Sequence, residues 1–279
     1  MSLPDFLVLG AQRAGTTWLD RRLRSHPAIY LPARRKELHY FDAHYALGAS
    51  WYERFFEDAK AGARIGEITP KYLYDPQVPA RIHADLPHAR LVAILRSPVD
   101  RAHSQYALAV RDDGEKRTFV EYAAAFPDVL ERGCYAEQLD RYFARFSREQ
   151  MLVLLFEEVM ARPEEALEHI ARFLGVDPDG FAGSGEARVN ESYRPQFPRA
   201  RAAARQVGVF LRRHDLDWIV NAAKELGMPE MFGNAGRVPP LAAAQRLVLV
   251  EHFASDVARL ERLLDRDLSH WMSPEPARS

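Results

Sequence analysis

The sequence predicts an α/β fold of the P-loop-like kind: a central parallel sheet flanked by helices in three layers, with further helices at the C-terminal end. Short apolar segments alternate with amphipathic segments of helical period along most of the chain. A loop with two glycines joins the first apolar segment, residues 6–9, to the first helical pattern. Such alternation is typical of parallel strands connected by helices that cover both faces of the sheet.

Each expected strand is a short apolar run, and each expected helix repeats its apolar side chains every three or four residues. Ligands of such sheets bind at the carboxyl ends of the strands, so segments that come after different strands can meet there. The expected strands are residues 6–9, 63–68, 91–95 and 151–156, and the expected helices are residues 17–25, 77–85, 101–111, 135–146 and 163–174.

The chain is expected to form one domain over residues 1–279, with a nucleotide-binding α/β core (1–198) and a helical C-terminal part (199–279). Two helices rich in Ala, Arg and Leu are expected at 199–226 and 241–266, with a turn-rich segment between them. The last helix carries an apolar stripe that indicates core packing. Its members are Leu247, Val250, Phe253, Val257, Leu260 and Leu264.

Composition limits the function classes. The 279 residues carry a net charge of −1, which gives no indication of a general nucleic-acid binder. The single cysteine, Cys134, excludes an internal disulfide and a cysteine metal cluster, and no His, Cys or Asp group has ligand spacing, so no metal is expected. No segment has the length or apolar character of a membrane span or a leader, so we expect a cytoplasmic protein that does not bind a membrane.

The segment from Gly10 to Thr17 has the glycine spacing of a phosphate-binding loop. Strand, loop and helix N-terminus together predict an anion site, because free backbone N–H groups and the helix dipole converge there. Thr16 stands where nucleotide triphosphatases have lysine, and the nearest cation is Arg13. The loop therefore predicts that the protein binds a phosphorylated nucleotide, but it does not predict a nucleotide triphosphatase. Its expected binding residues are Gln12, Arg13, Ala14, Gly15, Thr16, Thr17 and Trp18.

This loop resembles the 5′-phosphosulfate loop of sulfotransferases that use 3′-phosphoadenosine 5′-phosphosulfate. Residues 34–42 (RRKELHYFD) and 91–106 (LVAILRSPVDRAHSQY) resemble stretches of the heparan sulfate sulfotransferases. The resemblance covers about residues 4–200, with gaps. It implies transfer of a sulfonyl group from that donor to a hydroxyl or amine, with adenosine 3′,5′-bisphosphate as product and no metal.

The resemblance also implies roles for single residues. Arg13 matches a loop lysine that contacts the sulfonate, and its role is expected to be electrostatic because arginine stays charged. Arg96 and Ser104 match residues that bind the 3′-phosphate. The structural alternative for Arg96 is a salt bridge to Asp100, and Arg101 is expected to be solvent-facing or structural.

The general base is open between two residues. Glu37 matches the glutamate base of the heparan-type enzymes, whereas His39 is the kind of base used by cytosolic sulfotransferases of small molecules. In an extended segment both side chains point the same way. Either could instead pair with neighbouring cations. Lys71 is a further catalytic candidate, although Ile68 occupies the position where the resembling enzymes have lysine.

A late segment around Tyr193 and Arg194 resembles the loop that closes over the nucleotide in sulfotransferases. Arg194 is the expected basic contact, and Tyr193 is expected near the adenine; an exposed loop arginine is the alternative.

The expected acceptor is a soluble small molecule or a carbohydrate-like metabolite, and its identity and the oligomeric state remain open. The aromatic residues Trp51, Tyr52, Phe55, Phe56, Tyr72 and Tyr74 could line an acceptor pocket, although such spacing is more often core. The alternatives to a sulfotransferase are a P-loop kinase of small molecules or nucleotides, and a non-catalytic nucleotide-binding protein of the same fold. The missing loop lysine counts against the kinase.

Overall fold

The structure is a computed structural model that describes residues 3–181, 193–195, 206–208 and 234–274. Its main feature is a sheet of five strands in the order β2-β3-β1-β4-β5, and every pair is parallel. The strands are β1 (Phe6–Gly10), β2 (Ile29–Tyr30), β3 (Arg64–Ile68), β4 (Arg90–Leu95) and β5 (Met151–Leu155). The α/β fold with a central parallel sheet is therefore confirmed.

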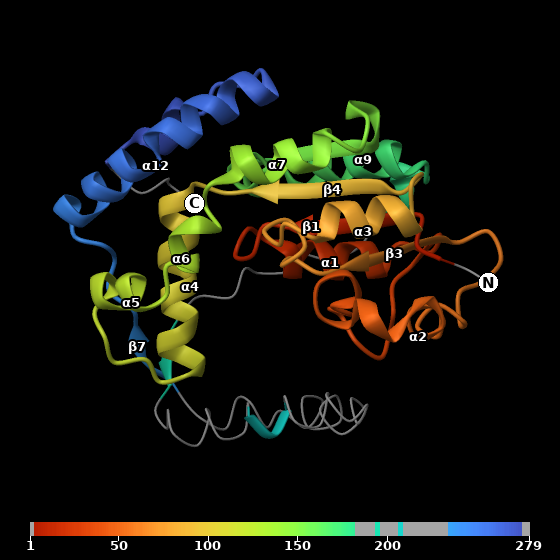
Figure 1. Ribbon diagram of the computed structural model, residues 1–279, viewed down its shortest axis with the longest axis horizontal. Coiled ribbons are helices and arrows are strands. Elements are labelled where there is room, and N and C mark those ends of the chain that lie inside the picture. Colours follow the sequence, from red (N-terminus) through yellow and green to blue (C-terminus); the bar gives the residue numbers. More distant parts are fainter. Residues whose placement is uncertain (1–2, 182–192, 196–205, 209–233, 275–279) are drawn as a thin grey trace.

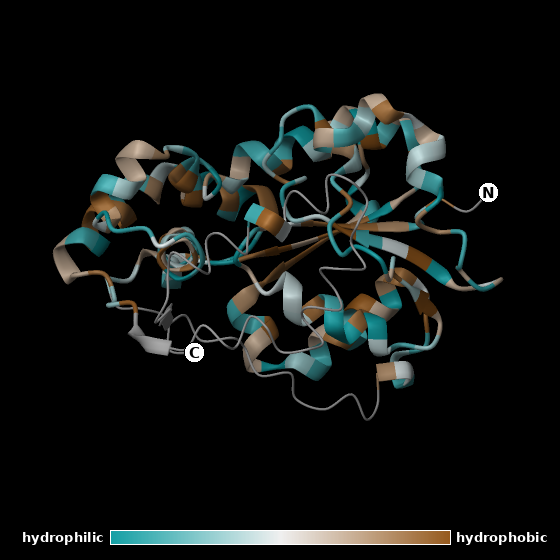
Figure 2. Ribbon diagram, turned by 90° about the horizontal axis from the view of Figure 1, so that it is seen from below, coloured by the Kyte–Doolittle hydropathy of each residue, from teal (hydrophilic) through white to brown (hydrophobic). Residues whose placement is uncertain are grey.

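Helices lie on both sides of this sheet, and Figure 2 shows the largely hydrophobic strands between them. The longer helices are α1 (Thr16–Ser25), α3 (Val78–Asp85), α4 (Pro98–Asp112), α7 (Tyr135–Phe143), α9 (Pro163–Leu174) and α12 (Ala243–Leu264). The shorter helices are α2 (Ala49–Glu53), α5 (Phe119–Ala125), α6 (Asp128–Glu131) and α8 (Phe156–Ala161).

Strand β1 occupies the centre of the sheet because its whole length is apolar. Phe6, Leu7, Val8 and Leu9 are all fully buried, as expected of a strand covered on both faces. The chain passes from β1 to β2 on one side and later crosses to β4 on the other. The carboxyl end of β1 is therefore the point where the strand order reverses, which is the usual ligand position in such sheets.

The four expected strands and five expected helices of the core are present, with shifted ends. Helix α4 begins at Pro98, earlier than expected, because the Ser97 hydroxyl accepts the Asp100 N–H (3.5 Å) and proline suits the first turn. Helix α7 ends at Phe143 instead of residue 146. Strand β2 was not predicted, since two residues show no period.

The C-terminal part differs more from the expectation. Strand β7 (Asn234–Arg237) lies within the stretch expected to be turns, and it pairs antiparallel with β6 (Tyr193–Pro195). A pairing between segments so far apart in the sequence leaves no local pattern. The helix expected at 199–226 lies outside the described residues except for helical residues 206–208, and the boundary between 198 and 199 stays a prediction.

Helix α12 packs against α7 and α4, as Figure 1 shows. Arg246 pairs with Asp100 at 2.7 Å, and Asp256 accepts the N–H of Ala136 at 3.2 Å. The expected stripe is buried except at its start and end: Leu264 is only partly buried, and Leu247 is exposed while Leu249 is buried in its place. Among the described residues, no helix is both long and apolar enough to cross a membrane.

Candidate active site

The residues predicted to bind or react converge at the carboxyl edge of the sheet. The loop after β1 contacts α4, which comes after β4, because Arg13 Nε donates to Ser104 Oγ at 3.1 Å. The same loop contacts the residue directly after β4, since Arg96 Nη1 donates to the carbonyl of Arg13 at 3.2 Å. Arg13, Arg96 and Ser104 therefore form one group, although Arg96 and Ser104 come 83 and 91 residues after Arg13 in the sequence.

The phosphate-type loop ends in a glycine that no other residue could replace without strain. Gly15 has φ of 86°, and a Cβ there would lie 3.0 Å from the ring of Phe156. Helix α1 begins at Thr16, so its first-turn N–H groups face the loop. Thr16 is buried, whereas Thr17 is exposed and its hydroxyl accepts from Lys36 Nζ at 3.2 Å. The expected anion site at this helix N-terminus thus has the required backbone.

Positive charge accumulates at this point. Burial, followed by the charges of Arg111 and Arg96, lowers the pKa of Arg13 to about 10. Arg96 lies over the ring of Phe156, with its guanidinium carbon 4.6 Å from the ring centre. Cations held this close together in a half-buried place are stabilised by an anion. The group is therefore electrostatically suited to a phosphate.

The structural alternatives for the neighbouring residues are resolved. Asp100 pairs with Arg246 rather than with Arg96. Arg101 is fully buried and donates to Gln105 Oε1 at 2.7 Å and to the carbonyl of Val129. The structural interpretation of Arg101 is correct, and the solvent-facing one is wrong.

Glu37, His39 and Lys71 meet in a second network. Glu37 Oε2 lies 3.4 Å from His39 Nε2, while His39 Nδ1 lies 3.1 Å from Asp42 Oδ2. Lys71 Nζ lies 3.0 Å from the same Asp42 oxygen, and the Asp42 side chain is fully buried. Asp42 had no predicted role, although an acid three residues after His39 was the available signal.

This network fixes the charge of the histidine. Burial lowers the pKa of His39, but hydrogen bonds to Asp42 and Glu37 outweigh burial and raise the pKa to about 9. For Asp42, burial raises the pKa, and contacts with His39 and Lys71 bring it below its ordinary value. At neutral pH His39 is then an imidazolium, which cannot accept a proton. Of the two candidate bases, His39 is therefore not in the form that accepts a proton.

The buried carboxylate of Glu67 is linked to this network through Thr69. Glu67 is fully buried and accepts from Thr69 Oγ1 at 2.6 Å, from Tyr72 at 2.7 Å and from Tyr52. Thr69 Oγ1 in turn accepts the backbone N–H of His39 at 3.4 Å. Tyr52 and Tyr72 therefore belong to the core, as do Phe55 and Phe56.

The remaining loop residues have structural neighbours. Gln12 Oε1 accepts from Arg132 Nη1 at 2.9 Å, Ala14 is buried, and Trp18 is partly buried against the core. Arg132 also lies over the ring of Tyr74, with its guanidinium carbon 4.4 Å from the ring centre. Nothing in the sequence indicated that Arg132 reaches the loop.

The late segment is only partly described. The backbone of Tyr193 and Arg194 belongs to β6, which lies beside α4. Their side chains are outside the described part of the structure, so their expected contacts with the nucleotide stay predictions.

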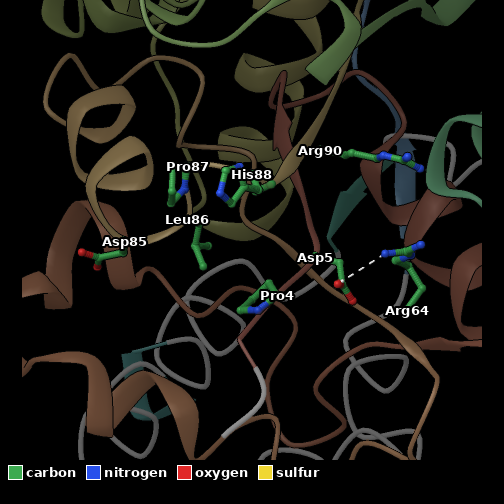
Figure 3. A pocket seen from close by; sticks show the side chains of 9 residues that line it. Pro4, Asp5, Arg64, Asp85, Leu86, Pro87, His88 and Arg90 are labelled. Atoms are coloured by element: carbon green, nitrogen blue, oxygen red, sulfur yellow. Dashed lines mark hydrogen bonds and ion pairs between the residues drawn. The ribbon is translucent and has the colours of Figure 1, made fainter.

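A separate hollow lies away from these residues. It has a volume of about 430 Å³ and is lined by residues at the starts of strands, including Asp5 just before β1, Arg64 at the start of β3 and Arg90 at the start of β4 (Figure 3). It lies at the amino edge of the sheet, opposite the converging residues. In the described residues no group of three His, Cys, Asp or Glu side chains could hold a metal ion. Burial raises the pKa of the Cys134 thiol to about 11, which argues against a nucleophile.

Comparison with known proteins identifies the family. Residues 3–194 match the family model described as sulfotransferase domain. The chain belongs to the sulfotransferase family. Family and fold together make it a transferase.

Individual relatives agree with this family. The chain is 39% identical over 114 residues to a membrane-associated sulfotransferase of Dictyostelium discoideum, covering 40% of this chain and 24% of that protein. It is 32% identical over 183 residues to human heparan sulfate glucosamine 3-O-sulfotransferase 3B1, covering 62% and 46%. The matches thus span less than half of these relatives. A crystal structure of a sulfotransferase from Alicyclobacillus acidocaldarius has a TM-score of 0.72 at 28% identity, covering 98% of this chain and 100% of that one.

The charge assignment of His39 is testable. Asp42→Asn should lower the pKa of His39 from about 9 toward the ordinary value of 6.5, because it removes the buried negative charge beside Nδ1. The pKa is measured by NMR of the imidazole resonances across a pH series. Asp256→Asn, which removes a half-buried carboxylate on α12, is the control and should leave the His39 titration unchanged. A wild-type pKa near 6.5 would contradict the assignment and return His39 as a candidate base.

Proposed function

We propose that this protein transfers a sulfonyl group from 3′-phosphoadenosine 5′-phosphosulfate to a hydroxyl or amine of an acceptor, leaving adenosine 3′,5′-bisphosphate. Membership of the sulfotransferase family supports the reaction class. The observation that carries the proposal is the contact of Arg13 with Ser104 and Arg96 beside the N-terminus of α1. A donor with phosphates at both its 5′ and 3′ positions suits two neighbouring anion-binding points.

The nucleotide is assigned to residues on both sides of this contact. The loop from Gln12 to Trp18 is assigned to its 5′ end, where Gly15, Thr16 and Thr17 offer backbone N–H groups. Arg96 and Ser104 bind the 3′-phosphate, the former by charge and the latter by its hydroxyl. Tyr193 and Arg194 stay proposed contacts of the nucleotide.

Arg13 is assigned to the charge that develops during transfer. The donor supplies a sulfonyl group bonded to a phosphate oxygen, and that oxygen keeps the electron pair when the bond breaks. A cation held beside the loop stabilises this charge in the transition state more than in the ground state. The lowered pKa of Arg13, about 10, still leaves it charged at neutral pH.

Glu37 is assigned as the general base that takes the proton from the acceptor. Its neighbour His39 is protonated, and His39 Nε2 lies 3.4 Å from Glu37 Oε2. Lys36 Nζ lies 3.9 Å from Glu37 Oε1. An ionised carboxylate is the form that accepts a proton, and Glu37 is proposed to have that form beside these two cations. His39 then holds Glu37 in place rather than acting as the base.

Lys71 is assigned as a positioning residue. Ile68, at the position where the resembling enzymes have lysine, is 1% exposed and belongs to the core. Lys71 is bonded to Asp42, which holds His39. Its ammonium therefore acts on the base through two intermediate side chains.

The acceptor is proposed to be a carbohydrate or a small molecule, and the relative named for heparan sulfate supports the carbohydrate. A cytoplasmic location and independence from metal ions also remain predictions.

The nucleotide assignment predicts strong discrimination by the 3′-phosphate. Adenosine 3′,5′-bisphosphate should bind more tightly than AMP, since a hydrogen bond to a charged group contributes about 1.5–3 kcal/mol. Calorimetry of both ligands, with EDTA present, measures the difference. Equal affinities would show that Arg96 and Ser104 do not bind this phosphate. Tight binding of ATP with Mg²⁺ but not of the bisphosphate would favour the kinase.

The base assignment predicts a ranking of two variants. Glu37→Gln should keep affinity for the bisphosphate but lose turnover by about 100- to 10,000-fold, because the amide cannot accept a proton. His39→Asn should lose less, since the carboxylate remains. Transfer of label from ³⁵S-labelled donor to an accepted acceptor measures both rates. The opposite ranking would make His39 the base.

A further inference from the structure

The peptide bond between Arg96 and Ser97 is held from both sides by side chains of other elements. The hydroxyl of Tyr135, the first residue of α7, donates to the carbonyl oxygen of Arg96 at 3.0 Å. On the other side of the same peptide, the N–H of Ser97 donates to Glu157 Oε1 at 3.0 Å. Glu157 lies in the first turn of α8, directly after β5. Three segments far apart in sequence therefore fix one peptide plane.

Burial makes both hydrogen bonds difficult to replace by water. Tyr135 is fully buried and Ser97 is 2% exposed. The second carboxylate oxygen of Glu157 is also buried and has no hydrogen-bond partner among the described residues. A buried carbonyl or N–H that loses its partner is left unsatisfied, so the peptide has little freedom to rotate.

The side chain of Arg96 is restrained by the same elements. Its guanidinium lies over the ring of Phe156, the residue before Glu157, and donates to the carbonyl of Arg13. Glu157 and Phe156 thus hold the backbone and the side chain of Arg96, respectively, from one helix. Tyr135 completes the arrangement from α7.

We infer that Tyr135 and Glu157 are positioning residues, which fix the Arg96–Ser97 peptide and thereby aim the Arg96 guanidinium at the 3′-phosphate of the donor. The inference rests on the proposed function, since it needs Arg96 to bind that phosphate. A bidentate contact depends on the angle of the guanidinium as well as on its charge. Loss of the peptide restraint should therefore weaken the 3′-phosphate contact selectively, and it should spare the 5′ end of the nucleotide.

The experiment compares Tyr135→Phe with a matched control on the same helix. Tyr142 is equally buried, and its hydroxyl donates to the carbonyl of Tyr72 at 2.8 Å, away from Arg96. Each phenylalanine variant loses one hydroxyl and one buried hydrogen bond. The dissociation constants of adenosine 3′,5′-bisphosphate and of AMP are measured by calorimetry, and thermal unfolding is recorded for each variant.

Tyr135→Phe should weaken binding of the bisphosphate about tenfold, which corresponds to partial loss of one charge-assisted contact, and should leave AMP within about twofold. Tyr142→Phe should leave the ratio of the two dissociation constants at the wild-type value. The two variants should lose similar thermal stability, while the ratio of the two dissociation constants should change in Tyr135→Phe alone. That result would distinguish a positioning role of Tyr135 from a general structural effect.

Glu157 provides the second, independent arm. Glu157→Ala should also lower the preference for the bisphosphate over AMP about tenfold. Glu157→Gln retains an oxygen that accepts the Ser97 N–H, so this variant should keep most of the wild-type preference. An unchanged preference in both Tyr135→Phe and Glu157→Ala, in a wild-type protein that prefers the bisphosphate, would overturn the positioning inference alone. A wild-type protein without that preference would overturn the proposed function, and the inference with it.

Discussion

The accumulation of positive charge around Arg13 is the constraint on which the proposed active site depends. Arg13 is removed from much of its solvent while Arg111 and Arg96 repel it, and these effects together lower its pKa to about 10. Among the charged neighbours that shift this pKa, Asp112 acts in the opposite direction. Repulsion between these cations destabilises the protein without a ligand, and a bound anion with two phosphates reduces that repulsion. The same group that costs stability is thus the one that is suited to binding the donor.

Sheet topology explains why these residues meet. Strand β1 lies between β3 and β4, so the segments that leave all three strands emerge at one edge. The loop after β1 supplies Arg13, the exit of β4 supplies Arg96, and the exit of β3 supplies Lys71. Glu67 and its hydroxyl partners are buried beneath this edge, and Thr69 links them to the backbone of His39. The base network and the cation group therefore rest on the same sheet.

Local order along the chain was enough to predict the residues at the ends of strands, but not the residues whose role depends on distant partners. The order of strand, proline turn and helix predicted where Arg96 and Ser104 lie, and the family resemblance supplied their expected role at the 3′-phosphate. Tyr135 and Glu157 were missed because their relation to Arg96 exists only after α7 and α8 have packed. Leu247 was misplaced for the same reason: an apolar period shows that a helix has a buried face, but only packing shows where that face ends. Family resemblance, not period, singled out Glu37, and the raised pKa of His39 is the observation on which the proposed choice between the two bases rests.

A crystal structure with adenosine 3′,5′-bisphosphate tests the central claim most directly. The account predicts the 5′-phosphate against the first turn of α1 beside Arg13, and the 3′-phosphate between the guanidinium of Arg96 and the hydroxyl of Ser104. Exchange of the two phosphates between these positions would contradict the assignment of each residue. A nucleotide bound at the amino edge, beside Arg64 and Arg90, would contradict the account as a whole.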